Sequence, residues 1–292
     1  MLVREGVEVH ALVRQGSSLE RVADIAGDLH LVRADLCDAD EVARQVARIA
    51  PELCLHGAWY AVPGEYLHAD ENVGLVAATA SLVSVLARAG CRRFVGVGTC
   101  FEYDTRVGRL SESSPTRPGS MYAASKLAAF LLAEQIGSKH GMGVAWARLF
   151  YQYGPYEDER RLVPAVVGAL LRGEEAPVTG GAQVRDFLYV EDVAGALWAI
   201  ARSAVGGPVN VGSGEPVSVR DLVERIAAIM GRRDLLAFGN FPDRPDDPPL
   251  ACANNRRLVE ECGWRRNRTH DEGLLETVEW WRSRRSSPAA VR

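Results

Sequence analysis

The sequence lacks the features that mark nucleic-acid-binding, membrane-spanning and disulfide-stabilised proteins. Its 292 residues carry a formal net charge of -4, so no excess of basic residues indicates nucleic acid as a partner. No run of about 18 apolar residues predicts a membrane span. The six cysteines include no C-x-x-C pair, which argues against a disulfide framework or a metal site and fits a reducing compartment such as the cytoplasm. Small molecules are therefore the partners that we expect.

Hydrophobic periodicity predicts strands that alternate with helices through the first half of the chain. Runs of β-branched and apolar residues indicate the strands, and apolar residues three or four apart indicate the helices. Units of this length imply right-handed crossovers and a doubly wound parallel sheet with helices on both faces, which is an α/β fold. The expected strands are Val7–Val13, Leu29–Val32, Leu53–Trp59, Arg93–Gly98 and Val144–Phe150, and the expected helices are residues 19–25, Ala39–Ile49, Asn72–Ala89 and Tyr122–His140.

The pattern loosens beyond Pro155, where turn-rich segments separate shorter elements. We predict helices over residues 163–171, from Val193 and over 218–230, and a short strand over 187–190. Residues 1–155 are therefore expected to form the main domain. Residues 156–292 are expected to form mainly a smaller lobe, with some segments returning to the core.

Tyr122 and Lys126 lie one helical turn apart in the sequence, which places both side chains on the same helix face. A tyrosine with a pKa of about 10 is a poor acid–base catalyst near neutral pH, and a nearby positive charge lowers that pKa. Lys126 could supply this charge. The same spacing also arises by chance on solvent-facing helices, so the pair alone indicates little.

Thr99 ends the apolar segment Val95–Thr99, upstream of Tyr122 by about one strand-to-helix crossover. Ligands bind at the carboxyl ends of strands in open parallel sheets. A threonine there could donate a hydrogen bond to a substrate oxygen while the tyrosine transfers a proton. The alternative is that Thr99 caps a turn.

In this order, Thr99, Tyr122 and Lys126 resemble the Ser/Thr-Tyr-Lys catalytic set of the extended short-chain dehydrogenase/reductase family. The resemblance implies a Rossmann-like fold in which residues 1–155 bind coenzyme and residues 156–292 hold a nucleotide diphosphate sugar. It implies hydride exchange with NAD(H) or NADP(H), with Tyr122 as the acid–base, Lys126 tuning it and Thr99 orienting the reacting oxygen. Tyr122 and Lys126 are also expected to border the coenzyme. A 4-ketoreductase and a C4 epimerase both remain open.

Other segments resemble the family's coenzyme contacts. Asp35-Leu36 is similar to the adenine-contacting aspartate after the third strand, and Gly57-Ala58 to the small residues at a strand end beside the coenzyme. Members that prefer NAD carry an acidic residue after the second strand, whereas this chain has Arg14 and Ser17. A guanidinium and a hydroxyl can bind a 2′-phosphate, so we expect NADP(H) to be slightly favoured. The alternative is a solvent-facing Arg14.

The substrate contacts implied by the resemblance lie later in the chain. The segment that begins at Arg185 is similar to an R-D-F-x-x-V-x-D segment whose arginine contacts the diphosphate, and Arg244 matches a second diphosphate-binding arginine. Tyr151 takes the place of an asparagine that often contacts the substrate phosphates. The alternative for Arg185 is a salt bridge to Asp186 or Asp192.

Two positions depart from the family's sugar 4,6-dehydratases. These enzymes carry Asp-Glu where this chain has Cys100 and Phe101. A dehydratase needs an additional acid and base, and phenylalanine can supply neither. We therefore predict no dehydration, with Cys100 as a small packing residue. Glu102 is the first candidate if an acid–base pair exists after all.

The family's first strand and G-x-x-G-x-x-G turn, which bind the coenzyme pyrophosphate, are not present before Leu2–Gly6. We expect the natural gene to encode them upstream and the chain as given to bind coenzyme weakly. A non-catalytic coenzyme sensor or structural protein on the same fold is the second hypothesis. A homodimer is considered, and the sequence leaves the oligomeric state open.

Overall fold

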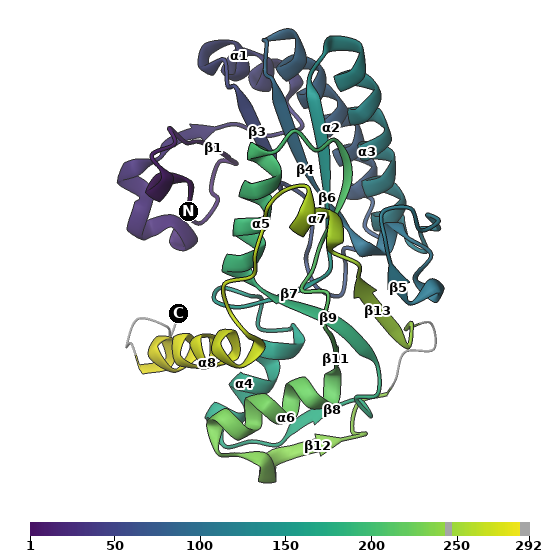
Figure 1. Cartoon of the computed structure of the whole chain (residues 1–292). Coiled ribbons are helices and arrows are strands. Elements are labelled where there is room, and N and C mark those ends of the chain that lie inside the picture. The colour runs from purple at the N-terminus through teal and green to yellow at the C-terminus, as the bar shows by residue number, and fades with distance from the viewer. Residues whose placement is uncertain (243–246, 287–292) are drawn as a thin grey trace.

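A four-stranded parallel sheet forms the centre of the upper half of the molecule (Figure 1). The computed structural model describes residues 1–242 and 247–286. Neighbouring strands of this sheet are all parallel, so their carboxyl ends meet at one edge. In spatial order the strands are β10 (Gly207–Val211), β6 (Gly143–Leu149), β4 (Arg93–Thr99) and β3 (Leu53–His56).

Helices cover both faces of this sheet because alternate strand residues point in opposite directions. Phe94 and Trp146 pack into a core with α1 (Ala39–Ile49), α2 (Glu71–Arg88) and α3 (Met121–His140). On the other face, Val95 and Ala145 pack against α5 (Val190–Arg202). Among the described residues, no helix is both long and apolar enough to cross a membrane.

A separate two-stranded parallel sheet lies beside this centre and consists of β1 (His10–Val13) and β2 (His30–Arg33). Figure 1 shows β1 to the left of β3. No strand of the described segments pairs with β1 or β3 across this interval, so the parallel arrangement is interrupted there.

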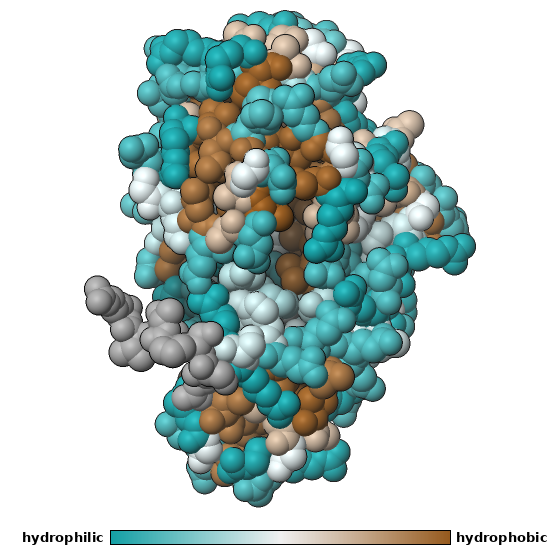
Figure 2. Space-filling view, turned by 90° about the vertical axis from the view of Figure 1, so that its left-hand side faces the viewer, coloured by the Kyte–Doolittle hydropathy of each residue, from teal (hydrophilic) through white to brown (hydrophobic). Residues whose placement is uncertain are grey.

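The lower lobe is built around β9 (Val184–Tyr189), which pairs with β7 (Tyr151–Tyr153), β11 (Pro216–Ser218) and β13 (Leu250–Ala253). Its core contains apolar residues of α4 (Leu162–Arg172), α6 (Val219–Met230) and α8 (His270–Ser286). In Figure 2, which faces the left side of Figure 1, apolar surface gathers over the upper half and over this lobe, with a more polar band between them. The remaining elements are β5 (Arg109–Leu110), β8 (Ala176–Val178), β12 (Leu236–Phe238), α7 (Arg256–Glu260) and the 3-10 helices Leu2–Glu5, Glu20–Asp28, Cys100–Glu102, Thr105–Val107 and Arg233–Leu235.

The α/β fold predicted from the sequence is confirmed, and its long elements agree closely with the structure. The helix expected over residues 39–49 is α1, and the helix expected over 122–140 is α3 from residue 121. Residues 19–25 were expected to form a regular helix, but residues 20–25 belong to the 3-10 helix Glu20–Asp28, which has no buried residue. Without a face against the core, nothing favours a longer regular helix over local 3-10 turns.

Candidate active site

Thr99 lies where β4 ends and a short 3-10 helix begins, and its side chain does serve as a cap. Its Oγ1 accepts a hydrogen bond from the backbone N–H of Phe101 at 3.3 Å. The Glu102 carboxylate in turn accepts one from the N–H of Thr99 at 2.9 Å. Capping therefore fixes the threonine at the carboxyl end of the central sheet, and the two interpretations considered for Thr99 are compatible.

Glu102 is fully buried and belongs to a hydrogen-bonded network. Its Oε1 also accepts from the Trp146 indole at 2.9 Å, and its Oε2 forms a buried ion pair with the Arg148 guanidinium at 2.7 Å. A Cβ atom at Gly98 would overlap both the Trp146 ring and the Glu102 carboxylate. The glycine thus makes room for a network that holds Thr99.

Tyr122 and Lys126 project from the first turns of α3 toward this strand end. Ser120 caps the helix by accepting from the N–H of Ala123 at 3.2 Å. The Lys126 Nζ donates to the carbonyl of Val97 at 2.7 Å, and it lies 4.0 Å from the centre of the Trp59 ring. The three residues predicted to be catalytic are therefore gathered at one edge of the sheet.

Burial controls the protonation of this pair. It raises the pKa of the Tyr122 phenol, and a hydrogen bond with the Thr99 side chain acts in the opposite direction. Burial also lowers the pKa of Lys126 to about 7, against the attraction of Glu102. Burial is thus the largest influence on the pKa of Tyr122, and it opposes the lowering that we expect from Lys126.

Lys126 should make stability depend on pH between about 7 and 10.5. Its pKa in the folded protein, about 7, lies below its ordinary value of 10.5, so the unfolded chain binds more protons across this interval. The free energy of unfolding should rise with pH there, and the rise should be smaller in Lys126→Met. Urea unfolding of both proteins at pH 7 and pH 9 measures the difference. Equal pH dependence would show that Lys126 stays protonated in the folded protein.

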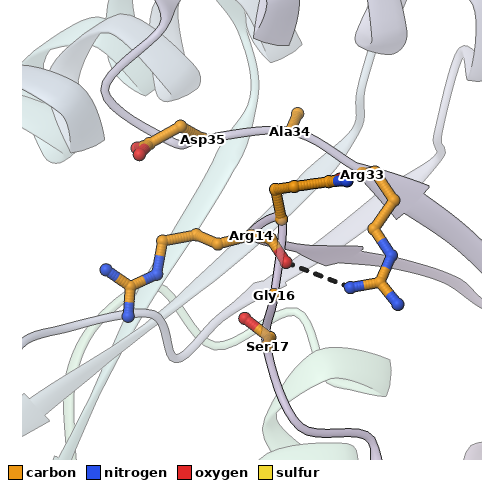
Figure 3. Close-up of a pocket in the computed structure, with 7 residues that line it drawn as sticks. Arg14, Gly16, Ser17, Arg33, Ala34 and Asp35 are labelled. Atoms are coloured by element: carbon orange, nitrogen blue, oxygen red, sulfur yellow. Dashed lines mark hydrogen bonds between the residues drawn. The ribbon is translucent and has the colours of Figure 1, made fainter.

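The predicted coenzyme residues Arg14, Ser17 and Asp35 line one pocket of about 510 Å³, formed by the loops after β1 and β2. Arg33 lines it as well and donates from Nη1 to the carbonyl of Arg14 at 3.1 Å. Figure 3 shows the Arg14 guanidinium extending to one side of these loops and the Arg33 side chain folding back on the other. This basic pocket fits an anionic group.

Sequence reasoning did not assign Arg33 to this pocket, although the residue directly follows the apolar stretch of β2. Arg161 was also missed. Its guanidinium lies 5.2 Å from the Tyr66 ring, and Tyr66 contacts Tyr122 edge to face with 4.8 Å between ring centres. No motif marks Arg161 in the sequence, since only the fold brings its loop close to Tyr66 and Tyr122.

The other predicted coenzyme residues lie elsewhere along the strand ends. Gly57 and Ala58 are exposed directly after β3. The Leu36 side chain is 7% exposed and packs in the core with Val42 and Val46, outside the pocket lining.

Arg185 is nearly buried in β9 beside Tyr151, with 5.5 Å from its guanidinium to the ring centre. Its ion pair is with Asp247, at 2.5 Å from Nη2 to Oδ1, so the alternative of a salt bridge to Asp186 or Asp192 is wrong. Those carboxylates accept backbone N–H groups instead, Asp186 from residues 213, 214 and 253 and Asp192 from 267 and 268. Arg244 lies outside the described residues.

Cys100 and Phe101 offer no acid–base pair. Cys100 is 2% exposed, and burial raises the pKa of its thiol to about 12. Phe101 packs edge to face against Tyr151 with 6.2 Å between ring centres. Cys100 lies in a small apolar cluster with Tyr103 and Phe150, which confirms it as a packing residue. Glu102 is the remaining candidate for an acid–base group. Its carboxylate already accepts hydrogen bonds from the N–H of Thr99, the Trp146 indole and the Arg148 guanidinium.

Known proteins resemble the chain in sequence and in structure. It is 30% identical over 281 residues to a dTDP-glucose 4,6-dehydratase of Streptomyces niveus, covering 92% of this chain and 80% of that protein. It matches the UDP-N-acetylglucosamine 4-epimerase of Methanobrevibacter ruminantium at 25% identity and a TM-score of 0.85, over 95% of this chain and 91% of the other. MoeE5 in complex with UDP-glucose and NAD matches at 29% identity and a TM-score of 0.81, over 98% and 94%. The family model for the NAD dependent epimerase/dehydratase family matches residues 1–212, and the chain therefore belongs to that family.

Proposed function

We propose that this chain is an enzyme that acts on a nucleotide diphosphate sugar with a nicotinamide coenzyme, by 4-ketoreduction or C4 epimerisation. The observation that carries the proposal is the meeting of Tyr122, Thr99 and Lys126 at the carboxyl end of β4, where the Lys126 Nζ donates to the carbonyl of Val97 and Thr99 acts on the pKa of the Tyr122 phenol. Relatives with this fold are named as dehydratases and epimerases of nucleotide sugars. An arrangement of this kind has no evident purpose in a protein that only binds coenzyme.

Each residue of the set has a chemical task in this proposal. Tyr122 exchanges a proton with the oxygen at the reacting sugar carbon, and Thr99 orients that oxygen by a hydrogen bond. Lys126 determines the charge next to the phenol. A bound nicotinamide would supply or accept the hydride. A diphosphate that reaches Arg185 has to replace Asp247 as its anionic partner, since that carboxylate occupies the guanidinium.

The relatives named as dehydratases make 4,6-dehydration a third reaction to consider, and the residues of the site argue against it. Loss of the C6 hydroxyl requires removal of the C5 proton and protonation of the leaving hydroxyl, hence an acid and a base besides Tyr122. Cys100 is buried with a raised pKa, Phe101 cannot transfer protons, and Glu102 is bound in the network below Thr99.

We therefore expect no 4-keto-6-deoxy product from nucleotide-diphosphate glucose substrates, and turnover of a 4-keto sugar with reduced coenzyme or interconversion of C4 epimers. Incubation with each substrate class and separation of the products by mass and chromatography measures this. Robust dehydration would overturn the proposed reaction. Coenzyme binding without turnover of any nucleotide sugar would favour the sensor hypothesis instead.

NADP(H) is the coenzyme that we propose, although NAD is the one named with the related structures. Arg14, Ser17 and Arg33 surround the pocket and could bind a 2′-phosphate. Loss of one charge-assisted hydrogen-bonding group costs about 1.5–3 kcal/mol. Arg33→Ala should therefore weaken NADPH binding by roughly 10- to 100-fold and leave NADH affinity nearly unchanged. Fluorescence titration with both coenzymes measures this, with the exposed Arg92→Ala as control. Tighter binding of NADH by the wild type would make Arg14 and Arg33 surface residues only.

A further inference from the structure

Two histidines stand side by side where β1 and β2 begin. The parallel register pairs His10 with His30, and their rings stack with 4.6 Å between centres and 19° between planes. The Glu8 Oε1 lies 3.0 Å from the His10 Nε2 and 3.6 Å from the His30 Nε2. Two imidazoles and a carboxylate therefore converge at one point, at the opposite end of these strands from the pocket that Arg14 and Arg33 line.

This spacing suits a metal ion. One ligand atom from each of the three side chains lies within 4.8 Å of the others. Tetrahedral Zn²⁺ has bonds of about 2.0–2.1 Å, which places its ligand atoms about 3.4 Å apart. The two distances from Glu8 lie on either side of that value. Imidazole nitrogen and carboxylate oxygen are both ordinary zinc ligands, and three protein ligands leave the fourth position for water.

The site is also open to an ion from solvent. Side-chain exposure is 72% for Glu8, 61% for His30 and 26% for His10. Binding therefore needs little desolvation, but the stacked rings have to tilt so that both Nε2 lone pairs point at one ion. Cysteine spacing gave no sign of a metal site in the sequence, and the histidines are far apart in the chain until the strand register brings them together.

We propose that Glu8, His10 and His30 bind a divalent transition-metal ion, with Zn²⁺ as the best match, and that this ion ties β1 to β2. An isolated two-stranded sheet is marginally stable, and this one pairs with no other strand among the described residues. A metal bridge at the start of both strands stabilises their pairing, because ions that bind only the folded arrangement add their binding free energy to it.

Titration of the whole chain with Zn²⁺ by calorimetry, and with Co²⁺ by visible absorption, tests the proposal. We expect one ion per chain, a Co²⁺ spectrum of a four-coordinate site, and a rise in melting temperature with Zn²⁺. His30→Ala should weaken Zn²⁺ binding by about 100-fold or more. Loss of a residue that only hydrogen-bonds to a metal ligand already lowers metal affinity by about 10- to 100-fold, and His30 would bind the ion directly. His140→Ala removes an exposed histidine at the end of α3 and should change nothing.

Equal affinity of the wild type, His30→Ala and His140→Ala would overturn the proposal and indicate scattered surface binding. If His30→Ala disturbs the strands without metal, as seen by circular dichroism, Glu8→Gln repeats the test with an exposed side chain of the same shape. Retention of full Zn²⁺ affinity by Glu8→Gln would remove the carboxylate from the site. None of these measurements depends on catalysis, so their result is independent of the proposed function.

Discussion

Tyr122→Phe should lower turnover by about 100-fold or more while leaving the fold and coenzyme affinity close to those of the wild type. The change removes the hydroxyl that would exchange a proton with the sugar oxygen, and general acid–base groups contribute factors of this size. The ring is kept, so its edge-to-face contact with Tyr66 remains. Steady-state kinetics on the substrate that the product analysis identifies, together with coenzyme titration, measures both quantities.

Tyr153→Phe is the matched control for this substitution. It also deletes the hydroxyl of a buried tyrosine, one that donates to the carbonyl of His270 at 3.2 Å in the lower lobe. This variant should lose some stability and keep its turnover. Near wild-type turnover in Tyr122→Phe, or an equal loss in both variants, would remove Tyr122 from the acid–base role.

The second large effect should be on stability. Glu102→Gln removes the charge opposite Arg148, whose guanidinium side chain is 3% exposed, and leaves that cation buried without its counterion. Breaking a buried pair in this way costs about 3–5 kcal/mol. Urea unfolding should show a loss of this size. Turnover of the folded fraction should change less than stability, because the amide oxygen of glutamine can still accept from the N–H of Thr99.

Two further variants test whether the loss of stability in Glu102→Gln comes from the buried, unpaired charge of Arg148. Glu41→Gln breaks the exposed ion pair with Arg44 and should cost about 0–1 kcal/mol. Glu102→Leu combined with Arg148→Met removes both charges and should be more stable than Glu102→Gln, since no buried charge remains unpaired. A loss below about 1 kcal/mol in Glu102→Gln would show that water or another group satisfies Arg148.

The sequence predicted the elements whose apolar residues recur regularly and missed those whose place depends on distant partners. α1 shows clear helical periodicity, α3 is a long apolar stretch bounded by the cap residues Ser120 and Gly141, and β4 is an apolar run, so their bounds could be read directly. β7 and β13 are short, and they are strands because distant segments pair with them, β9 with β7 and both β9 and β5 with β13.

The same distinction applies to the candidate site. Tyr122 and Lys126 are four residues apart on one helix, so their proximity is local and predictable. The pairing of Arg185 with Asp247 joins different loops and strands, and no spacing rule anticipates it. The raised pKa of Tyr122 likewise follows from burial, which is a property of the assembled fold and not of the pair.

The position of β10 has a consequence for synthesis on the ribosome. β6 lies between β4 and β10 in the central sheet, and β10 comes from the second half of the chain. Residues 144–148 of β6 are all buried in the finished protein. During translation this strand emerges with β4 available on one side and an open edge on the other until residue 211 has left the exit tunnel. Exposed apolar strand edges associate readily, so the nascent chain would depend on chaperones most during the interval between these two strands.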